Sequence, residues 1–160
     1  MVVSLGQEMN EVNGAQLAQL KQAAMSSPQK RARICLHRDH YEKVQEMVIA
    51  FCRDSYVRPH RHAGKSESFH MIEGELLLVL FSECGQVTRR TRLSPGECDG
   101  TFLCRLPGDV WHSVIPLSTF VIVHETTTGP FLKDTTEHAL WCPDGSNAEE
   151  IAEFQAYMMR

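Results

Sequence analysis

A succession of short apolar segments separated by turn residues is the feature that most constrains the fold of this chain. The segments occupy 44–51, 69–81, 86–93, 100–107, 110–115 and 119–125. The stretch LLLVLF at 76–81 is apolar throughout, as expected of a strand that is buried on both faces. Several short strands at this spacing, bounded by Gly, Pro and Ser, predict a β-sandwich or barrel.

A helical pattern precedes this β-rich part. Over Gly14–Met25, apolar residues recur at helical spacing, and Ser26, Ser27 and Pro28 end the pattern. Residues 29–40 are basic and show no regular alternation, so we interpret them as an irregular arm.

A second helix is predicted at the C-terminal end. Ser146, with Glu149 three residues later, matches a capping box. One apolar helical stripe follows, made of Ile151, Phe154, Tyr157 and Met158. The chain has 160 residues, which suits a single core. We therefore expect one domain with an N-terminal helix and arm (1–43), a barrel (44–143) and a C-terminal helix (144–160).

Composition argues against several classes of partner. The net charge is −4, whereas a nucleic-acid-binding surface is usually basic. No apolar run reaches the roughly 18 residues of a membrane span. The first residues lack the pattern of a secretory signal, and no two of the six cysteines form a C-x-x-C pair. We expect a cytoplasmic protein with reduced cysteines and neither a nucleic-acid nor a membrane partner.

The residues with the clearest chemistry lie in the stretch YVRPHRHAGKSESF at 56–69. His60 and His62 are two residues apart, so on a strand they project from the same face. Glu67 follows after a short polar turn that can bring its carboxylate alongside them. His112 lies on a later strand, after Pro107-Gly108-Asp109, and closure of a barrel would bring it near. Three histidines and one carboxylate can hold a divalent metal and leave a position open for substrate.

These residues carry a resemblance to the cupin superfamily. His60, His62, Glu67 and Gly74 match the pattern H-x-H-x4-E-x6-G, and Pro107 with His112 resembles the second motif. The resemblance implies an all-β cupin double-stranded β-helix, a jelly-roll barrel, with peripheral helices, and it also implies a homodimer. Asp109 stands where the second motif has its glycine. Asp accepts the left-handed conformation less readily than Gly does, so this substitution bears on the turn and not on a ligand.

The chain further resembles the WbuC family of cupin-fold metalloproteins, from about Arg31 to Trp141. The strongest stretches are 56–62, 65–69, 107–112 and 129–131. Members often occur among genes for bacterial surface-polysaccharide synthesis, and the reaction is not settled. The resemblance therefore implies one divalent metal ion, which could be Fe, Zn, Mn or Ni.

Other residues are candidates for chemistry beside the metal. Tyr56 and Arg58 have the parity of His60 and His62, so an extended strand would turn them inward too. There Arg58 could bind a substrate carboxylate or phosphate, although it could equally pair with an internal acid or reach solvent. Glu125 and Tyr56 are candidates for moving a proton, and for Glu125 a solvated strand end is the alternative.

The remaining histidines favour a structural interpretation. His70 has the opposite parity to Glu67 and should face away from the metal. Similarly, Trp111 should face away from the side of His112 and pack. His37, His40 and His138 fall in stretches without a clear pattern.

Three hypotheses for function follow. The first is a metal-dependent isomerase or epimerase acting on a sugar or sugar-nucleotide derivative in surface-polysaccharide synthesis. The second is an Fe(II) dioxygenase, because the same ligands suit iron. The third is a binding module that holds a metal and a small ligand without turnover.

Overall fold

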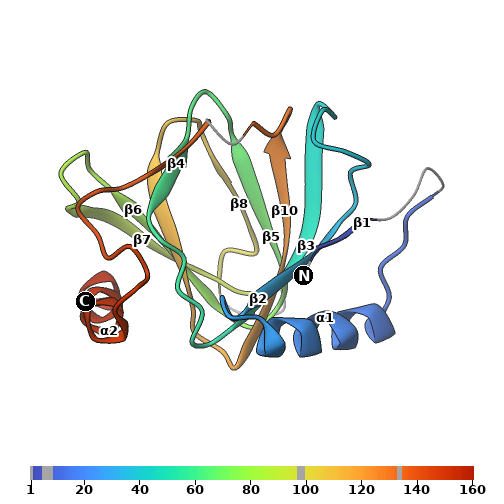
Figure 1. The fold of residues 1–160 in the computed structure, drawn as a ribbon, viewed down its shortest axis with the longest axis horizontal. Coiled ribbons are helices and arrows are strands. Elements are labelled where there is room, and N and C mark those ends of the chain that lie inside the picture. Colours follow the sequence, from blue (N-terminus) through green and yellow to red (C-terminus); the bar gives the residue numbers. More distant parts are fainter. Residues whose placement is uncertain (1, 5–8, 97–99, 133–134) are drawn as a thin grey trace.

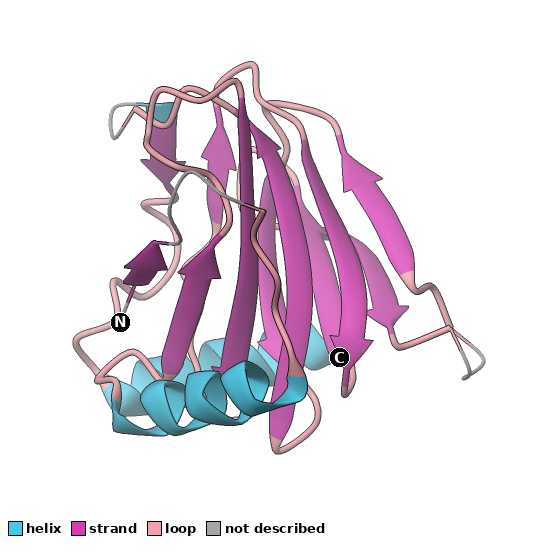
Figure 2. Ribbon diagram, turned by 90° about the vertical axis from the view of Figure 1, so that its right-hand side faces the viewer, coloured by secondary structure: helices cyan, strands magenta, loops and turns pink. Residues whose placement is uncertain are grey.

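The structure is a computed structural model that describes residues 2–4, 9–96, 100–132 and 135–160. Two β-sheets face each other and two helices lie outside them (Figures 1 and 2). In spatial order, the first sheet contains β1 (Val2–Ser4), β2 (Arg31–Cys35), β3 (Val44–Cys52), β10 (Phe120–Thr128), β5 (Glu67–Glu73) and β8 (Leu103–Leu106). The second contains β11 (Thr136–His138), β4 (His60–His62), β9 (Trp111–Pro116), β6 (Leu76–Phe81) and β7 (Val87–Leu93). The predicted cupin-type jelly-roll barrel with peripheral helices is confirmed.

The main core lies between the two sheets, because alternate residues of each strand point inward. The inward set from β3 includes Met47, Ile49 and Phe51, and β10 adds Val121 and Val123. These side chains meet an apolar set from the other strands, made of Phe69, Met71, Leu76, Leu78, Leu93, Leu106 and Val114.

The helices cover the outer faces. Helix α1 (Gly14–Ser26) packs Leu20 and Ala24 against the outward residues of β2 and β3, such as Ala50. Helix α2 (Ala148–Met159) packs Met158 with the cluster that contains Trp111 on the outer face of the second sheet. Among the described residues, no helix is long and apolar enough to cross a membrane.

The inner positions change from apolar to polar along several strands. On β10, Val121 and Val123 are followed by Glu125, and on β5 Phe69 is next to Glu67 in the inward series. On β9, Val114 has His112 as its inward neighbour. The registers pair Glu125 with Phe69 and Leu80 with His112, so these polar residues gather at one end of the barrel.

Three boundaries differ from the predictions. Residues 31–35 are not irregular but form strand β2, because they pair in antiparallel register with β3. The segment 69–81 is divided into β5 and β6 by a turn in which Gly74 has a φ of 75°. The N-cap of α2 is Asn147 and not Ser146, since the Asn147 side chain accepts from the backbone N–H groups of residues 149 and 150.

Five cysteines fall within the described residues and all five are free, as predicted. They are Cys35, Cys52, Cys84, Cys104 and Cys142. Cys98 lies outside the described residues.

Candidate metal centre

The second sheet brings three histidines together. Strand β4 places His60 and His62 on its inner face, and β9 pairs with it so that His60 lies opposite His112. One ring nitrogen of each histidine lies within 4.8 Å of the other two. The ring centroids of His60 and His112 are 4.4 Å apart. The structure thus brings together three imidazoles from two parts of the sequence.

Glu67 reaches the histidines from the opposite sheet. Its Oε1 lies 3.0 Å from Nε2 of His62, and its Oε2 lies 2.9 Å from Nε2 of His112. Burial alone would raise the pKa of the Glu67 carboxyl, but the contacts with His112 and His62 outweigh it and hold the pKa well below the ordinary value. Glu67 is therefore a buried carboxylate, which is the form that binds a metal.

The other ring nitrogen of each histidine contacts an oxygen atom. Nδ1 of His60 lies 2.9 Å from the carbonyl oxygen of Arg58, and Nδ1 of His112 lies 2.9 Å from that of Val110. A carbonyl oxygen only accepts, so each Nδ1 carries the proton and each Nε2 is left with a lone pair. Nδ1 of His62 lies 3.0 Å from Oγ1 of Thr136. Such contacts hold ligand histidines in the tautomer that a metal needs.

The buried atoms at the centre require a cation. With the His112 proton on Nδ1, the His112 Nε2 and the Glu67 Oε2 are two acceptors 2.9 Å apart. Both atoms are buried and have no hydrogen-bond partner among the described residues. Two buried acceptors face each other only at a cost, unless a proton or a metal lies between them. Three Nε2 atoms and one carboxylate therefore fit a divalent metal ion.

Burial also keeps one ligand candidate in its neutral form. Burial, reinforced by the neighbouring His112, lowers the pKa of His60 to about 3. A neutral imidazole keeps the lone pair that a metal requires, so His60 needs no deprotonation near neutral pH.

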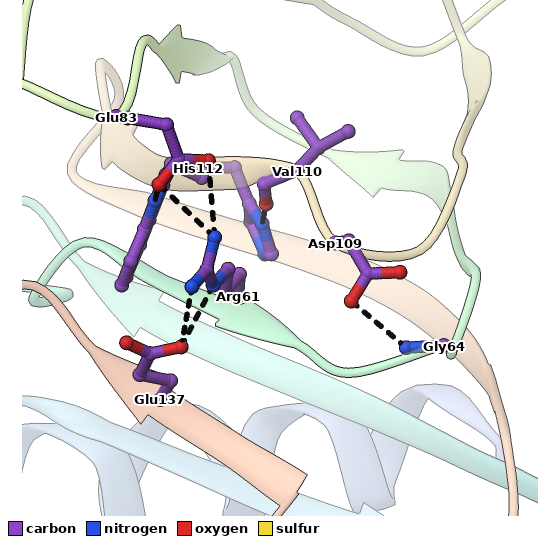
Figure 3. A network of polar contacts seen from close by, with 8 residues as sticks. Arg61, Gly64, Glu83, Asp109, Val110, His112 and Glu137 are labelled. Carbon is purple, nitrogen blue, oxygen red and sulfur yellow. Dashed lines mark hydrogen bonds and ion pairs between the residues drawn. The ribbon is translucent and has the colours of Figure 1, made fainter.

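The turn before β9 fixes the position of His112. Asp109 adopts a φ of 67°, so the chain accepts the left-handed conformation here without the glycine of the family pattern. Its Oδ1 accepts a hydrogen bond of 3.1 Å from the backbone N–H of Gly64 (Figure 3). The N–H of Asp109 donates to the carbonyl oxygen of His62. The turn is thereby tied directly to the chain that carries His62.

Arg61 stabilises strand β4 from its outer side, which the sequence did not indicate. It lies between the two histidines of β4 and points to the other face, where it pairs with Glu137 at 2.8 Å and Glu83 at 3.0 Å (Figure 3). Its guanidinium also stacks 4.5 Å from the ring of Trp111. Trp111 faces outward as predicted, so one arginine links β4, β9 and β11 behind the histidines.

Glu125 lies inside the barrel, in register with Phe69 of β5 and Met47 of β3. Burial raises the pKa of the Glu125 carboxyl to about 8, and the negative charge of Glu67 acts in the same direction. The positive charges of Arg33 and Arg31 act in the opposite direction. Glu125 is therefore near the four residues and can hold a proton at neutral pH.

Tyr56 and Arg58 do not share the inner face, so that expectation is wrong. Strand β4 begins only at His60, and the buried Pro59 precedes it, so strand parity does not extend back to residue 56. The Tyr56 hydroxyl donates to the carbonyl oxygen of Pro143 at 2.8 Å within the outer cluster. Nη2 of Arg58 donates to the carbonyl oxygen of Ala139, and the side chain lines a hollow of about 760 Å³ beside α2. This hollow lies outside the barrel and does not include the histidines.

Thr136 and His138 lie beside the candidate metal centre, although no sequence pattern indicates this position. Strand β11 pairs Thr136 with His62 and His138 with His60, so both face the same side as the histidines of β4. The rings of His60 and His138 are 6.0 Å apart. Only the pairing of the three-residue strand β11 with β4 shows that Thr136 and His138 lie beside the histidines. His70 is exposed on the outer face, as predicted.

Solved structures with the same fold include proteins of low sequence identity. The protein TT1209 from Thermus thermophilus has a TM-score of 0.56 and 19% identity, over 77% of this chain and 98% of that chain. The protein SO0799 from Shewanella oneidensis has a TM-score of 0.53 and 13% identity, over 62% of this chain and 63% of that one. A variant of the oxalate decarboxylase OxdC from Bacillus subtilis has a TM-score of 0.50 and 19% identity, over 61% of this chain and 24% of that chain.

The chain therefore spans less than two thirds of the length of the Shewanella protein and about a quarter of the decarboxylase. These likenesses support the fold. A search of curated proteins found no match. One family model, described as a domain of unknown function (DUF6016), matches residues 12–93, which is just over half of the chain. The protein thus belongs to the DUF6016 family.

Proposed function

We propose that the protein is an enzyme that uses one divalent metal ion to act on a small polar substrate, a sugar or sugar-nucleotide derivative. The metal would be held by His60, His62, Glu67 and His112. The observation that carries this proposal is the buried pair of acceptors, Nε2 of His112 and Oε2 of Glu67, which lack a hydrogen-bond partner among the described residues.

A metal at this position would polarise a carbonyl or hydroxyl oxygen of the substrate. Glu125 would then take a proton from the carbon next to that group and return it, which gives an isomerisation or epimerisation. A base with a pKa near the working pH is efficient in both directions, and the buried position of Glu125 supports this role. Tyr56 has no part in this proposal, because its hydroxyl is bonded to Pro143 outside the barrel.

The finer family assignment also belongs to this proposal. The resemblance at 56–62, 65–69, 107–112 and 129–131 supports membership of the WbuC family, and with it a role in surface-polysaccharide synthesis. We propose a cytoplasmic homodimer with no nucleic-acid or membrane partner. The oxalate decarboxylase with the same fold supports an enzymatic role in general terms.

The first experiment is elemental analysis of the purified protein and of His112→Ala. We expect one divalent metal per wild-type chain and less than a tenth of that in the variant. His70→Ala is the matched control, because His70 lies on the outer face of the sheet. Equal metal content in wild type and His112→Ala would refute the metal centre.

The second experiment tests the reaction. Metal-loaded protein is incubated with nucleoside-diphosphate sugars in D2O, and mass spectrometry measures deuterium incorporated at carbon. Incorporation that disappears in Glu125→Gln supports isomerisation or epimerisation. Oxygen consumption by the iron form alone would instead favour a dioxygenase, because the same ligands suit iron. Binding without incorporation or oxygen consumption would identify a binding module and refute the enzyme.

A further inference from the structure

Strand β2 carries two arginines on the inner face of the first sheet, of which Arg31 is half-buried and Arg33 is exposed. Its register pairs Arg31 with Phe51 and Arg33 with Ile49, two β3 residues that point into the main core. The alternate β2 residues, Ala32 and Ile34, pack against helix α1. Arg31 and Arg33 must therefore lie on the inner face of the first sheet, the same face as Glu125.

Among the residues that the structure describes, neither guanidinium has a carboxylate partner. Within residues 9–96, 100–132 and 135–160, no carboxylate oxygen lies within 4.0 Å of either side chain. Nη1 of Arg31 donates to the carbonyl oxygen of Tyr56 at 3.3 Å, and Nη1 of Arg33 lies 3.7 Å from Sδ of Met47. Each guanidinium offers five donors, so among the described residues most of them have no partner and could bind an anion.

The strands between β2 and the candidate metal centre connect the arginines to it. Met47, which Arg33 contacts, is opposite Glu125 in the register, and Glu125 is opposite Phe69. The Phe69 ring is 6.4 Å from that of His112. Neighbouring strands are about 4.8 Å apart, so Met47 lies about 10 Å from the strand that carries Phe69 and Glu67.

The electrostatics agree with this placement. Burial lowers the pKa of Arg31, the positive charge of Arg33 lowers it further, and the carboxylate of Glu125 acts in the opposite direction, so both Arg33 and Glu125 lie near Arg31. The inner face thus has excess positive charge beside a polar site.

We propose that Arg31 and Arg33 bind an anionic group of the substrate, a carboxylate or a phosphate, while the far end of the same molecule lies at the histidines and Glu67. This inference rests on the proposed function for the reacting end of the substrate. It narrows the substrate class to acidic or phosphorylated sugars and excludes neutral sugars. Arginine suits this role because its planar fork binds both oxygens of such a group.

The site is tested first without metal, so that its failure can be separated from failure of the metal centre. Metal-free protein is titrated by calorimetry at low ionic strength with inorganic phosphate, glucuronate, glucose 6-phosphate and glucose. We expect glucuronate and glucose 6-phosphate each to bind at least tenfold more tightly than glucose. Arg33→Gln, at an exposed position, should lose most of this difference. Arg31→Gln should do the same, with circular dichroism reporting whether it folds.

Arg105→Gln is the matched control, because it removes the same charge from the outer face of the same sheet, where Arg105 is exposed. A preference for glucuronate over glucose 6-phosphate, or the reverse, identifies the carboxylate or the phosphate as the natural group. Equal affinities in wild type and Arg33→Gln would overturn the proposal. An equal loss in Arg105→Gln would overturn it too, because the binding would then follow net charge alone.

Discussion

Replacing Glu125 by glutamine should stabilise the metal-free protein, and more so at high pH. Burial raises the pKa of this carboxyl from its ordinary 4.5 to about 8. The folded protein therefore keeps the proton up to about pH 8, whereas the unfolded chain releases it near pH 4.5. Because the folded state binds more protons between these values, the free energy of unfolding of the wild type falls as pH rises through this window.

The size of the effect follows from the same values. At 1.36 kcal/mol per pH unit, a pKa moved from 4.5 to about 8 corresponds to at most about 5 kcal/mol. Glu125 retains some contact with solvent, so screening reduces the expected cost to about 2 kcal/mol. Glu125→Gln avoids this cost, since a neutral amide of the same shape cannot ionise.

The assay is urea unfolding followed by tryptophan fluorescence, with a chelator and a reductant, between about pH 4.5 and pH 9. The difference in unfolding free energy between variant and wild type should increase by about 2 kcal/mol over this range and become constant above pH 8. Glu153→Gln, at an exposed position of α2, should show no such trend. A difference that stays constant with pH, or decreases as pH rises, would refute the assignment of Glu125 to the barrel interior.

Three further predictions concern the metal centre and the turn that closes β5. His112→Ala should fold yet lose stoichiometric metal by elemental analysis, because it removes one of three converging nitrogens; retained metal would contradict this. Thr136→Val should weaken metal affinity about 10- to 100-fold in a chelator competition, because His62 loses the oxygen that orients it, and Thr136→Ser should restore it. Gly74→Ala should cost about 2 kcal/mol or more in urea unfolding, because φ is 75° and the added carbon would meet the Phe120 carbonyl oxygen. Gly145→Ala has a positive φ without such a contact and should cost less.

The local sequence pattern predicts the face of a side chain correctly wherever that side chain lies on a regular strand. His60 and His62 share a face because β4 is extended through both, and Glu67 and Phe69 share one on β5. The apolar stripe of α2 was predictable for the same reason, since periodicity is a local property.

Strand parity predicts the wrong side-chain direction where the regular strand ends. Parity was extended from His60 back to Tyr56, but the intervening segment is not a strand and contains Pro59, so the direction of each side chain changes. Strand β2 falls within residues 29–40, which the sequence predicts to be an irregular arm because they are basic and do not alternate, whereas an inner face is ordinarily apolar. Here the polar inner face is itself the sign of a binding site, which a hydrophobic pattern cannot show.

Strand β11 was unpredictable for a different reason. Three residues are too few to show a period, and residues 136–138 become a strand only because β4 offers them an edge. Thr136 and His138 therefore acquire their positions beside the centre from tertiary pairing. A sequence pattern cannot assign such residues until the pairing partner is known.

The candidate metal centre also has a structural consequence for the barrel. His60, His62 and His112 belong to the second sheet, whereas Glu67 belongs to the first. At the other end of the barrel, apolar side chains such as Val121 and Leu76 hold the sheets together by burial. At this end the polar Glu67, Glu125 and His112 share the inner face with apolar side chains such as Phe69 and Met47. A cation bound between Glu67 and the histidines would therefore add a link between the two sheets where the core is partly polar.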